Sequence, residues 1–223
     1  MHLGWSERVA KVTASILLVS VLLAGVGLAY VLTLDRAPST LVEAVYADAL
    51  AKVEAEPDDY EARIELAKAL GAAGQYRKAV TQLEIAAELS PEDPEPHTLM
   101  GVIYRMAGDT DKAIAAHEKA VTLPDGMGDV YLESYYELGQ LYVDEGEYDK
   151  AVEAFEQALV QGPELVYVAV ALADAYEKAG DIEAAYEEYV RILPTAPGNP
   201  EIESAFARLQ DALGEAAEEP DDE

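Results

Sequence analysis

A glycine that returns at nearly regular intervals constrains this chain more than any other feature. Gly74, Gly108, Gly146 and Gly180 are separated by 34, 38 and 34 residues. Other positions keep the same register around each glycine. A Leu or Met followed by a small residue precedes the glycine, and an alanine follows the glycine. A larger residue stands four positions after that alanine. These positions are Leu66-Ala67, Met100-Gly101, Leu138-Gly139 and Leu172-Ala173; Ala79, Ala113, Ala151 and Ala185; and Leu83, His117, Phe155 and Tyr189. Such a period is typical of a stacked helical array.

The pattern around each glycine predicts two helices of about a dozen residues joined by a tight turn. The glycine supplies the positive φ that ends the first helix. Small residues let the two helix backbones approach closely, and Pro91, Pro163 and Pro197 end the second helices, with Pro124 one place early. Because one such unit cannot bury its apolar face alone, we expect the units to stack into a solenoid.

These positions resemble the tetratricopeptide repeat (TPR) from about Tyr60 to Pro197. The resemblance implies an all-α solenoid of four helix-turn-helix repeats, at residues 60–93, 94–131, 132–165 and 166–199. The Trp position of the pattern is filled by Arg63, His97, Tyr135 and Ala169, so packing there departs from the family. The extra residues between the second and third repeats, near 124–129, are expected to form an inter-repeat loop.

Both flanks of the array carry helix signals. Thr40 and Glu43 form a candidate capping box for a helix over 41–56, within a linker and capping region at 35–59. After Pro200, apolar residues recur at helical spacing and predict a solvating C-terminal helix at 200–214. The acidic tail at 215–223 is expected to be disordered.

The N-terminal region contains an uncharged stretch of 23 residues, Val12 to Leu34. As a helix it would extend roughly 34 Å at about 1.5 Å per residue, enough to cross a bilayer. We expect a single transmembrane anchor at 12–34, preceded by a short cytoplasmic N-terminus at 1–11 that carries Arg8 and Lys11. The repeats would then lie outside the cytoplasm, at the cell membrane. A signal peptide cleaved near Ala29 is the alternative, which the length of the stretch disfavours.

Composition narrows the classes of function. The chain has 44 Asp and Glu against 15 Lys and Arg, a net charge of −29, which argues against nucleic acid as a partner. There is no cysteine, and His97 and His117 occupy packing positions of the repeats. Without a metal, nucleotide or nucleophile motif we predict no catalytic residue, no metal and no cofactor, and therefore not an enzyme.

The resemblance to TPR proteins implies a binding groove lined by the first helix of each repeat. Carried onto this chain, the partner-binding residues are Glu61, Lys68, Val102, Arg105, Tyr136, Gln140, Val143, Tyr167, Val170 and Asp174. Chaperone-binding members capture an acidic C-terminus with Lys, Arg and Asn. Here only Lys68 and Arg105 are available, and Asn199 lies outside the groove. An apolar or basic protein segment is therefore the expected partner.

The sequence predicts a membrane-tethered, non-catalytic scaffold that binds a segment of an envelope, secretion or cytochrome-assembly protein. Two alternatives remain open. One is a self-associating structural membrane protein, for which Gly25 and Ala29 provide a small-residue pair in the anchor. The other is a secreted, soluble TPR binding module released by signal cleavage.

Overall fold

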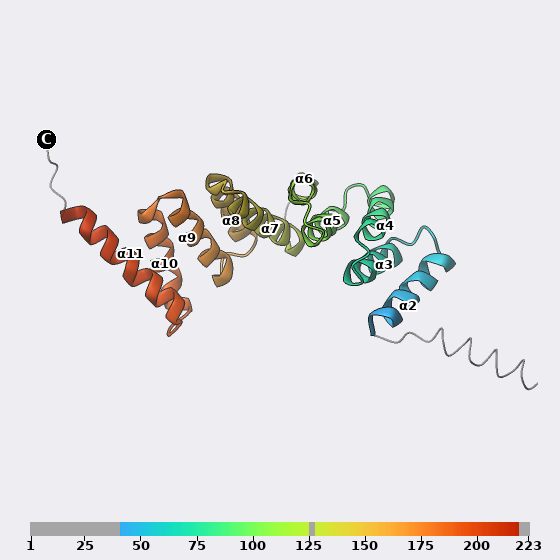
Figure 1. The fold of residues 1–223 in the computed structure, drawn as a ribbon, viewed down its shortest axis with the longest axis horizontal. Coiled ribbons are helices and arrows are strands. Elements are labelled where there is room, and N and C mark those ends of the chain that lie inside the picture. Colours follow the sequence, from blue (N-terminus) through green and yellow to red (C-terminus); the bar gives the residue numbers. More distant parts are fainter. Residues whose placement is uncertain (1–40, 125–127, 219–223) are drawn as a thin grey trace, which may run out of the picture. The chain divides into compact units, whose positions relative to one another are not determined.

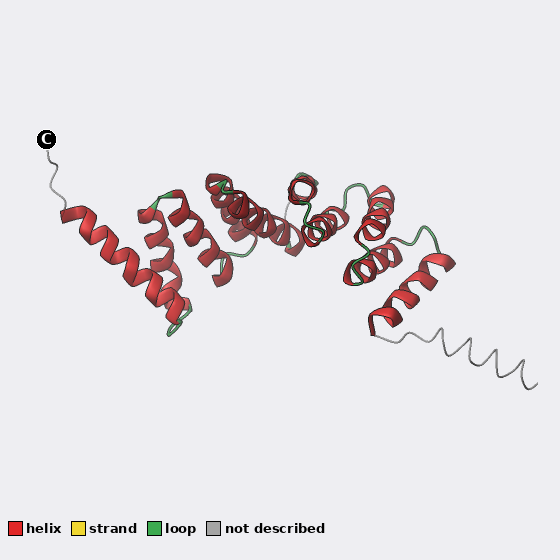
Figure 2. Ribbon diagram, in the orientation of Figure 1, coloured by secondary structure: helices red, strands yellow, loops and turns green. Residues whose placement is uncertain are grey.

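The computed structural model describes residues 41–124 and 128–218. Over these residues it contains ten α-helices, one short 3₁₀ helix and no strand, which confirms the all-α prediction for this part of the chain (Figures 1 and 2). The elements are α2 (Leu41–Ala55), α3 (Tyr60–Ala72), α4 (Tyr76–Leu89), α5 (Glu95–Met106), α6 (Thr110–Val121), α7 (Asp129–Glu145), α8 (Tyr148–Gln161), α9 (Val166–Ala179), α10 (Ile182–Ile192), η1 (Leu193–Thr195) and α11 (Pro200–Glu218).

The chain divides into two compact units, Met1–Asp48 and Ala49–Glu223. Of the first unit, only residues 41–48 at the start of α2 are described. In the second unit, α3 packs with α4, α5 with α6, α7 with α8 and α9 with α10, and each pair packs on the next in chain order. The array is closed by α11, which packs on α10. This unit is the predicted solenoid of four helical pairs.

The four recurring glycines end the first helices as predicted. Their φ angles are 71°, 77°, 77° and 89°, in the left-handed region that only glycine adopts without strain. At each of these turns the next residue donates its N–H to a carbonyl of the helix, as Gln75 does to Leu70 at 2.9 Å and Asp181 to Tyr176 at 2.9 Å. The turns thereby satisfy carbonyl groups that a helix end would otherwise leave unpaired.

A small residue on each first helix faces a larger one on the second helix of the same repeat. A Cβ at Gly101 would lie 2.4 Å from the His117 ring, and one at Gly139 would lie 2.4 Å from the Phe155 ring. The repeats with His117 and Phe155 have glycine opposite the ring, whereas the repeats with Leu83 and Tyr189 have alanine at that place. The close approach of the helix backbones therefore depends on the absence of these side chains.

Neighbouring repeats are joined by a recurring hydrogen bond. The hydroxyl of Tyr142 on α7 donates to Glu118 on α6 at 2.8 Å, and that of Tyr176 on α9 donates to Glu156 on α8 at 2.8 Å. Burial, followed by the bond to the carboxylate, raises the pKa of each tyrosine to about 12. Both tyrosines therefore stay neutral donors at physiological pH.

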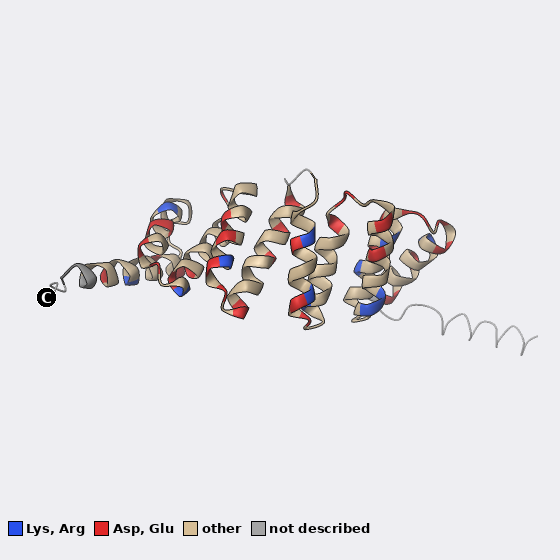
Figure 3. Cartoon of the chain, turned by 90° about the horizontal axis from the view of Figure 1, so that it is seen from above, with Lys and Arg blue, Asp and Glu red and all other residues tan. Residues whose placement is uncertain are grey.

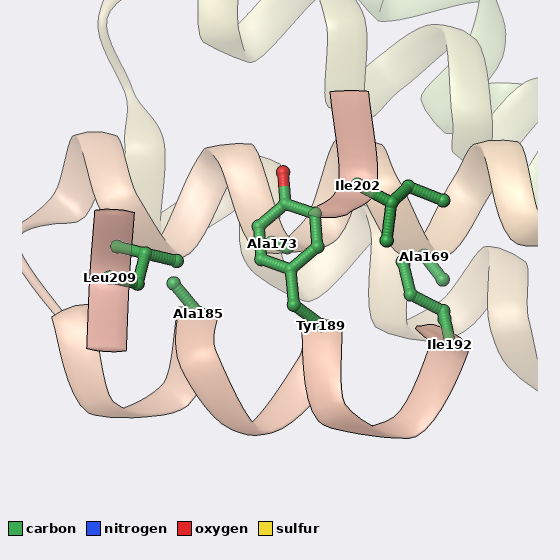
Figure 4. Close-up of a cluster of buried hydrophobic side chains, with 7 residues drawn as sticks. All are labelled: Ala169, Ala173, Ala185, Tyr189, Ile192, Ile202 and Leu209. Atoms are coloured by element: carbon green, nitrogen blue, oxygen red, sulfur yellow. The ribbon is translucent and has the colours of Figure 1, made fainter. Parts of the chain in front are cut away.

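The last helix covers the C-terminal end of the array. Ile202 and Leu209 are buried and join a cluster formed by α9 and α10 (Figure 4). Phe206 stacks on Tyr186 with the ring centroids 5.1 Å apart. The helix runs to Glu218, so residues 215–218 are helical and the prediction of a disordered tail starting at 215 is wrong for them. The segment Glu-Ala-Ala-Glu has high helix propensity, which explains the extension.

The insertion between the second and third repeats is shared between the predicted loop, which follows the end of α6 at Val121, and a longer helix. The first helix of the third repeat, α7, begins at Asp129 and has 17 residues, against 13 in α3 and 12 in α5. Part of the insertion therefore lengthens a helix instead of forming a loop. Tyr131 in this extra turn is buried, and its hydroxyl donates to the carbonyls of Leu123 and Pro124. Residues 125–127 lie outside the described part of the chain.

The predicted anchor at 12–34, its cleavage alternative and the capping residue Thr40 also lie outside the described residues. Among the helices that are described, none combines the length and the apolar character needed to span a bilayer. The membrane anchor thus stays a prediction from sequence.

Candidate functional site

The first helices of the four repeats carry the predicted partner-binding residues. We call one side of these helices, defined by the positions below, the first-helix face. Side chains at i, i+4, i+7 and i+11 share a side of an α-helix. On this face they are Glu61, Glu65, Lys68 and Ala72 of α3; Glu95, Leu99, Val102 and Met106 of α5; Glu133, Glu137, Gln140 and Asp144 of α7; and Tyr167, Ala171, Asp174 and Lys178 of α9. Six of the predicted partner-binding residues belong to it, and Arg105, Tyr136, Val143 and Val170 lie beside it.

Lys68 of this face and Arg105 beside it are paired with carboxylates of the next repeat. Lys68 Nζ lies 2.9 Å from Glu95 Oε1, and Arg105 pairs with Glu137. Each pair is substantially exposed, so it contributes on the order of 0–1 kcal/mol to stability. Lys68 and Arg105 are therefore engaged within the chain, which is a further reason against the capture of an acidic C-terminus.

Carboxylates outnumber cations over the first three repeats of the face. Glu61, Glu65, Glu95, Glu133, Glu137 and Asp144 stand against Lys68 on the face and Arg105 beside it, six negative charges against two positive, a local net charge of −4. Burial, and then the nearby Glu137 carboxylate, raise the pKa of Glu133 above its usual value. This part of the face therefore favours a basic partner. Figure 3 shows that acidic residues continue along the whole array and are not confined to one end.

The two predicted tyrosines form a pair with different degrees of exposure. The rings of Tyr136 and Tyr167 meet edge to face with centroids 5.2 Å apart, and Tyr136 also lies 5.8 Å from the buried ring of Phe155. Tyr136 is half-buried and hydrogen-bonded to Gln140, whereas Tyr167 is 51% exposed. Tyr136 thus supports the core, and Tyr167 is the member of the pair that a partner can reach.

The remaining predicted residues have mixed roles. Val143 packs against the cluster around Phe155, and Val170 packs against the C-terminal cluster. Asp174 accepts a hydrogen bond from the buried Tyr189 hydroxyl at 2.9 Å. Glu61 is exposed, and Val102 lines a pocket. The structure therefore brings together only part of the predicted set as an accessible surface.

That pocket was not predicted from the sequence. It is an apolar cavity of about 240 Å³ between α3, α4 and α5. Its walls are Ala67, Lys68, Gly71, Ala72, Leu83, Leu99, Val102, Ile103 and Met106. Only one charged side chain, Lys68, takes part, and Met106 is 51% exposed. The signal in the sequence was Gly71, a glycine inside a helix that is not one of the recurring turn glycines.

A second, more open pocket lies among the second-helix residues. It has a volume of about 610 Å³ and is lined from α4, α5 and α6 by residues that include His97, Met100, Tyr104 and Lys119. Burial, and then the charge of Lys119, lower the pKa of His97. The walls of this pocket carry both positive and negative charges, and the pocket is open to solvent. It therefore does not indicate one class of ligand.

A buried polar group sits between the second and third repeats. The hydroxyls of Thr98 and Ser134 are 2.7 Å apart, and His117 Nδ1 lies 3.5 Å from Ser134 Oγ. His117 is fully buried, and its Nε2 has no hydrogen-bond partner. Burial, and then the charge of Arg105, lower the pKa of His117 to about 4, so the ring is neutral at pH 7. The predicted packing role of His117 is confirmed by this burial.

The part of the chain that the structure describes does not assemble a metal site. No group of three or more His, Asp or Glu side chains there could hold a metal ion. The tyrosine pair, the acidic surface and the apolar pocket are features that are common in protein-binding surfaces.

Comparison with known proteins identifies the repeats. Three family models, each described as "Tetratricopeptide repeat", match residues 64–127, 97–159 and 142–209. Residues 64–209 are tetratricopeptide repeats. The TPR array is also similar to cellulose synthase operon protein C of Salmonella typhimurium strain LT2, with 30% identity over 154 residues. That match covers 65% of this chain but only 12% of the relative.

Solved structures agree with the TPR assignment. MamA has a TM-score of 0.57 and 26% identity over 73% of this chain and 83% of its own. YrrB, described as a TPR protein with an unusual peptide-binding site, has a TM-score of 0.57 over 74% of this chain and 82% of its own. Its identity of 18% shows the shared fold alone.

Proposed function

We propose that this chain is a non-catalytic TPR scaffold, tethered to the membrane through residues 12–34, that binds a segment of another protein on its first-helix face. The observation that carries the proposal is Tyr167, a large aromatic side chain that is half exposed on a face with many carboxylates. Exposed aromatic residues of this kind supply much of the binding energy in protein interfaces. The partner segment that fits is apolar or basic.

The tethering part of the proposal rests on the 23 uncharged residues from Val12 to Leu34. An anchor raises the effective concentration of the repeats for partners in the same membrane. Envelope, secretion or cytochrome assembly is the proposed setting, because an apolar N-terminal segment followed by a short TPR array suits a protein that gathers membrane-associated partners.

A topology measurement tests the tether. A reporter that is active only outside the cytoplasm is fused after Glu223, and its activity and membrane retention are measured together. Activity that stays with the membrane is the expected result. Activity released from the membrane would favour the cleaved, secreted module, and an inactive membrane-bound reporter would place the repeats in the cytoplasm.

A capture experiment tests the binding face. Membranes of the source organism are cross-linked, and the proteins held by the full chain are identified by mass spectrometry. We expect Tyr167→Ala to lose the partner, and the matched truncation Val160→Ala, at a side chain 61% exposed on α8, to keep it. Tyr136 is left unchanged because it packs on Phe155, so its removal would confuse binding with stability. Equal capture by both variants would remove this face from the proposal.

A further inference from the structure

The apolar pocket between α3 and α5 lies beside a glycine of α3, Gly71. At the position three residues before the turn glycine, the other repeats carry Arg105, Val143 and Glu177, whereas the first repeat carries Gly71. A glycine inside a helix costs about 1 kcal/mol relative to alanine. A Cβ at this place would lie 2.4 Å from Ile103 Cδ1. The glycine therefore lets Ile103 approach α3, and both residues form part of the pocket wall.

The size and lining of the cavity match a single apolar side chain. Its volume of about 240 Å³ exceeds that of a leucine or phenylalanine side chain, and its walls are methyl and methylene groups apart from the stem and ammonium of Lys68. Ala72 and Met106 stand at corresponding places on the two first helices and are both exposed, so the cavity opens on the first-helix face. A pocket with these walls excludes a charged side chain.

The surface next to the opening carries negative charge. Lys68, which lines the cavity, directs its ammonium to Glu95 at 2.9 Å. Glu133 on α7 is exposed, and the charges near it are those of Lys68, Glu95 and Glu137. Partial desolvation, followed by the Glu137 carboxylate, raises the pKa of Glu133 above its usual value. A cation brought to this place would relieve that repulsion, whereas an acidic segment would increase it.

We propose that the pocket between α3 and α5 receives one leucine-like or phenylalanine-like side chain of a partner segment, while a neighbouring Lys or Arg of that segment binds the carboxylate of Glu133, next to the paired carboxylates of Glu95 and Glu137. The inference rests on the proposed function, because it specifies the chemistry of the segment that the first-helix face binds. It adds a recognition rule: an apolar residue flanked by basic ones.

The test uses short synthetic peptides and the full chain in non-ionic detergent. The probe is a fluorescent peptide in which a central leucine is flanked on both sides by alternating lysine and alanine, and the control peptide has glycine in place of the leucine. At physiological ionic strength we expect the leucine peptide to bind at least about tenfold more tightly, from the burial of one leucine side chain. Fluorescence anisotropy measures both affinities.

Two variants test the location. Ala72→Leu places a side chain at the mouth of the pocket and is expected to abolish the preference for the leucine peptide. Ala207→Leu makes the same addition at an exposed position of α11 and is expected to leave it intact. Methyl-labelled methionine provides an independent readout by NMR. The Met106 signal should shift with the leucine peptide, and the Met100 signal should not, because Met100 lines the other pocket.

Equal affinity for the two peptides, a preference that survives Ala72→Leu, or a shift of Met100 without Met106 would each overturn the inference. Self-association that Ala72→Leu abolishes, without peptide binding, would assign the pocket to a second copy of the chain. If Tyr167→Ala releases the native partner and Ala72→Leu does not, the proposed function stands and the pocket inference fails. If the peptide preference holds but Tyr167→Ala has no effect on capture, the pocket inference stands and the proposed role of Tyr167 in binding fails.

Discussion

Replacing His117 with phenylalanine should change how the stability of the array depends on pH. His117 is fully buried with a pKa of about 4, against 6.5 for an unperturbed histidine. Between these two values the unfolded chain holds a proton that the folded chain does not. The histidine's contribution to stability is therefore fully present above about pH 6.5 and is lost as the pH falls toward about 4.

The difference of about 2.5 pKa units corresponds to about 3 kcal/mol in total, at 1.36 kcal/mol per unit. From about pH 7 to about pH 5 the loss is about 2 kcal/mol. Phenylalanine has no titrating group, and Phe155 shows that this ring fits over a glycine at the equivalent place of the next repeat. Ser134 keeps its bond to Thr98 at 2.7 Å after the substitution, so the variant should fold.

The assay is urea unfolding followed by circular dichroism, at several pH values between about 7 and 5, with both proteins in the same detergent. The carboxylates and His97 titrate in both, so their contribution cancels in the difference. We expect His117→Phe to lose about 2 kcal/mol less than the original chain over this range. Parallel stability curves for the two proteins would show that His117 is not held neutral by burial, and would refute the reasoning.

Three further substitutions test the packing and the helix ends. Gly139→Ala should destabilise the array by about 1–3 kcal/mol, because the added methyl group meets the buried Phe155 ring; Gly214→Ala, with nothing within 4 Å, should be neutral or stabilising by up to about 1 kcal/mol, and thermal unfolding compares them. Asp181→Ala removes the side chain that accepts the N–H of Ala184 at 3.0 Å, and should cost about 1 kcal/mol by the same measurement; an unchanged midpoint would show that this cap contributes nothing.

The features that could be predicted from the sequence are those set by local spacing. The turn glycines, the small and large packing positions and the burial of His117 all follow from the repeat register, because each depends on residues within one helical pair. The start of α7 at Asp129 could not be predicted, since the spacing of 38 residues fits either a longer loop or a longer helix. The burial of Tyr131 in the extra turn decides for the helix.

The candidate site was less predictable because it depends on contacts between repeats. Lys68 and Arg105 are obvious cations in the sequence, but their pairing with Glu95 and Glu137 depends on the distance between neighbouring first helices. Tyr136 was predicted to bind a partner, yet its ring packs against Phe155 on α8. The apolar pocket is lined by residues of α3, α4 and α5, so its presence depends on how these three helices pack.

The hydrogen bonds from Tyr142 to Glu118 and from Tyr176 to Glu156 have a consequence for how such a chain can change length. The two tyrosines are 34 residues apart, and each meets a glutamate of the repeat before it in the same way. A second copy of residues 142–175, inserted after residue 175, would meet matching partners at both of its ends. Arrays with interchangeable junctions grow or shorten by whole units, so the extent of the binding surface can evolve without a new kind of contact.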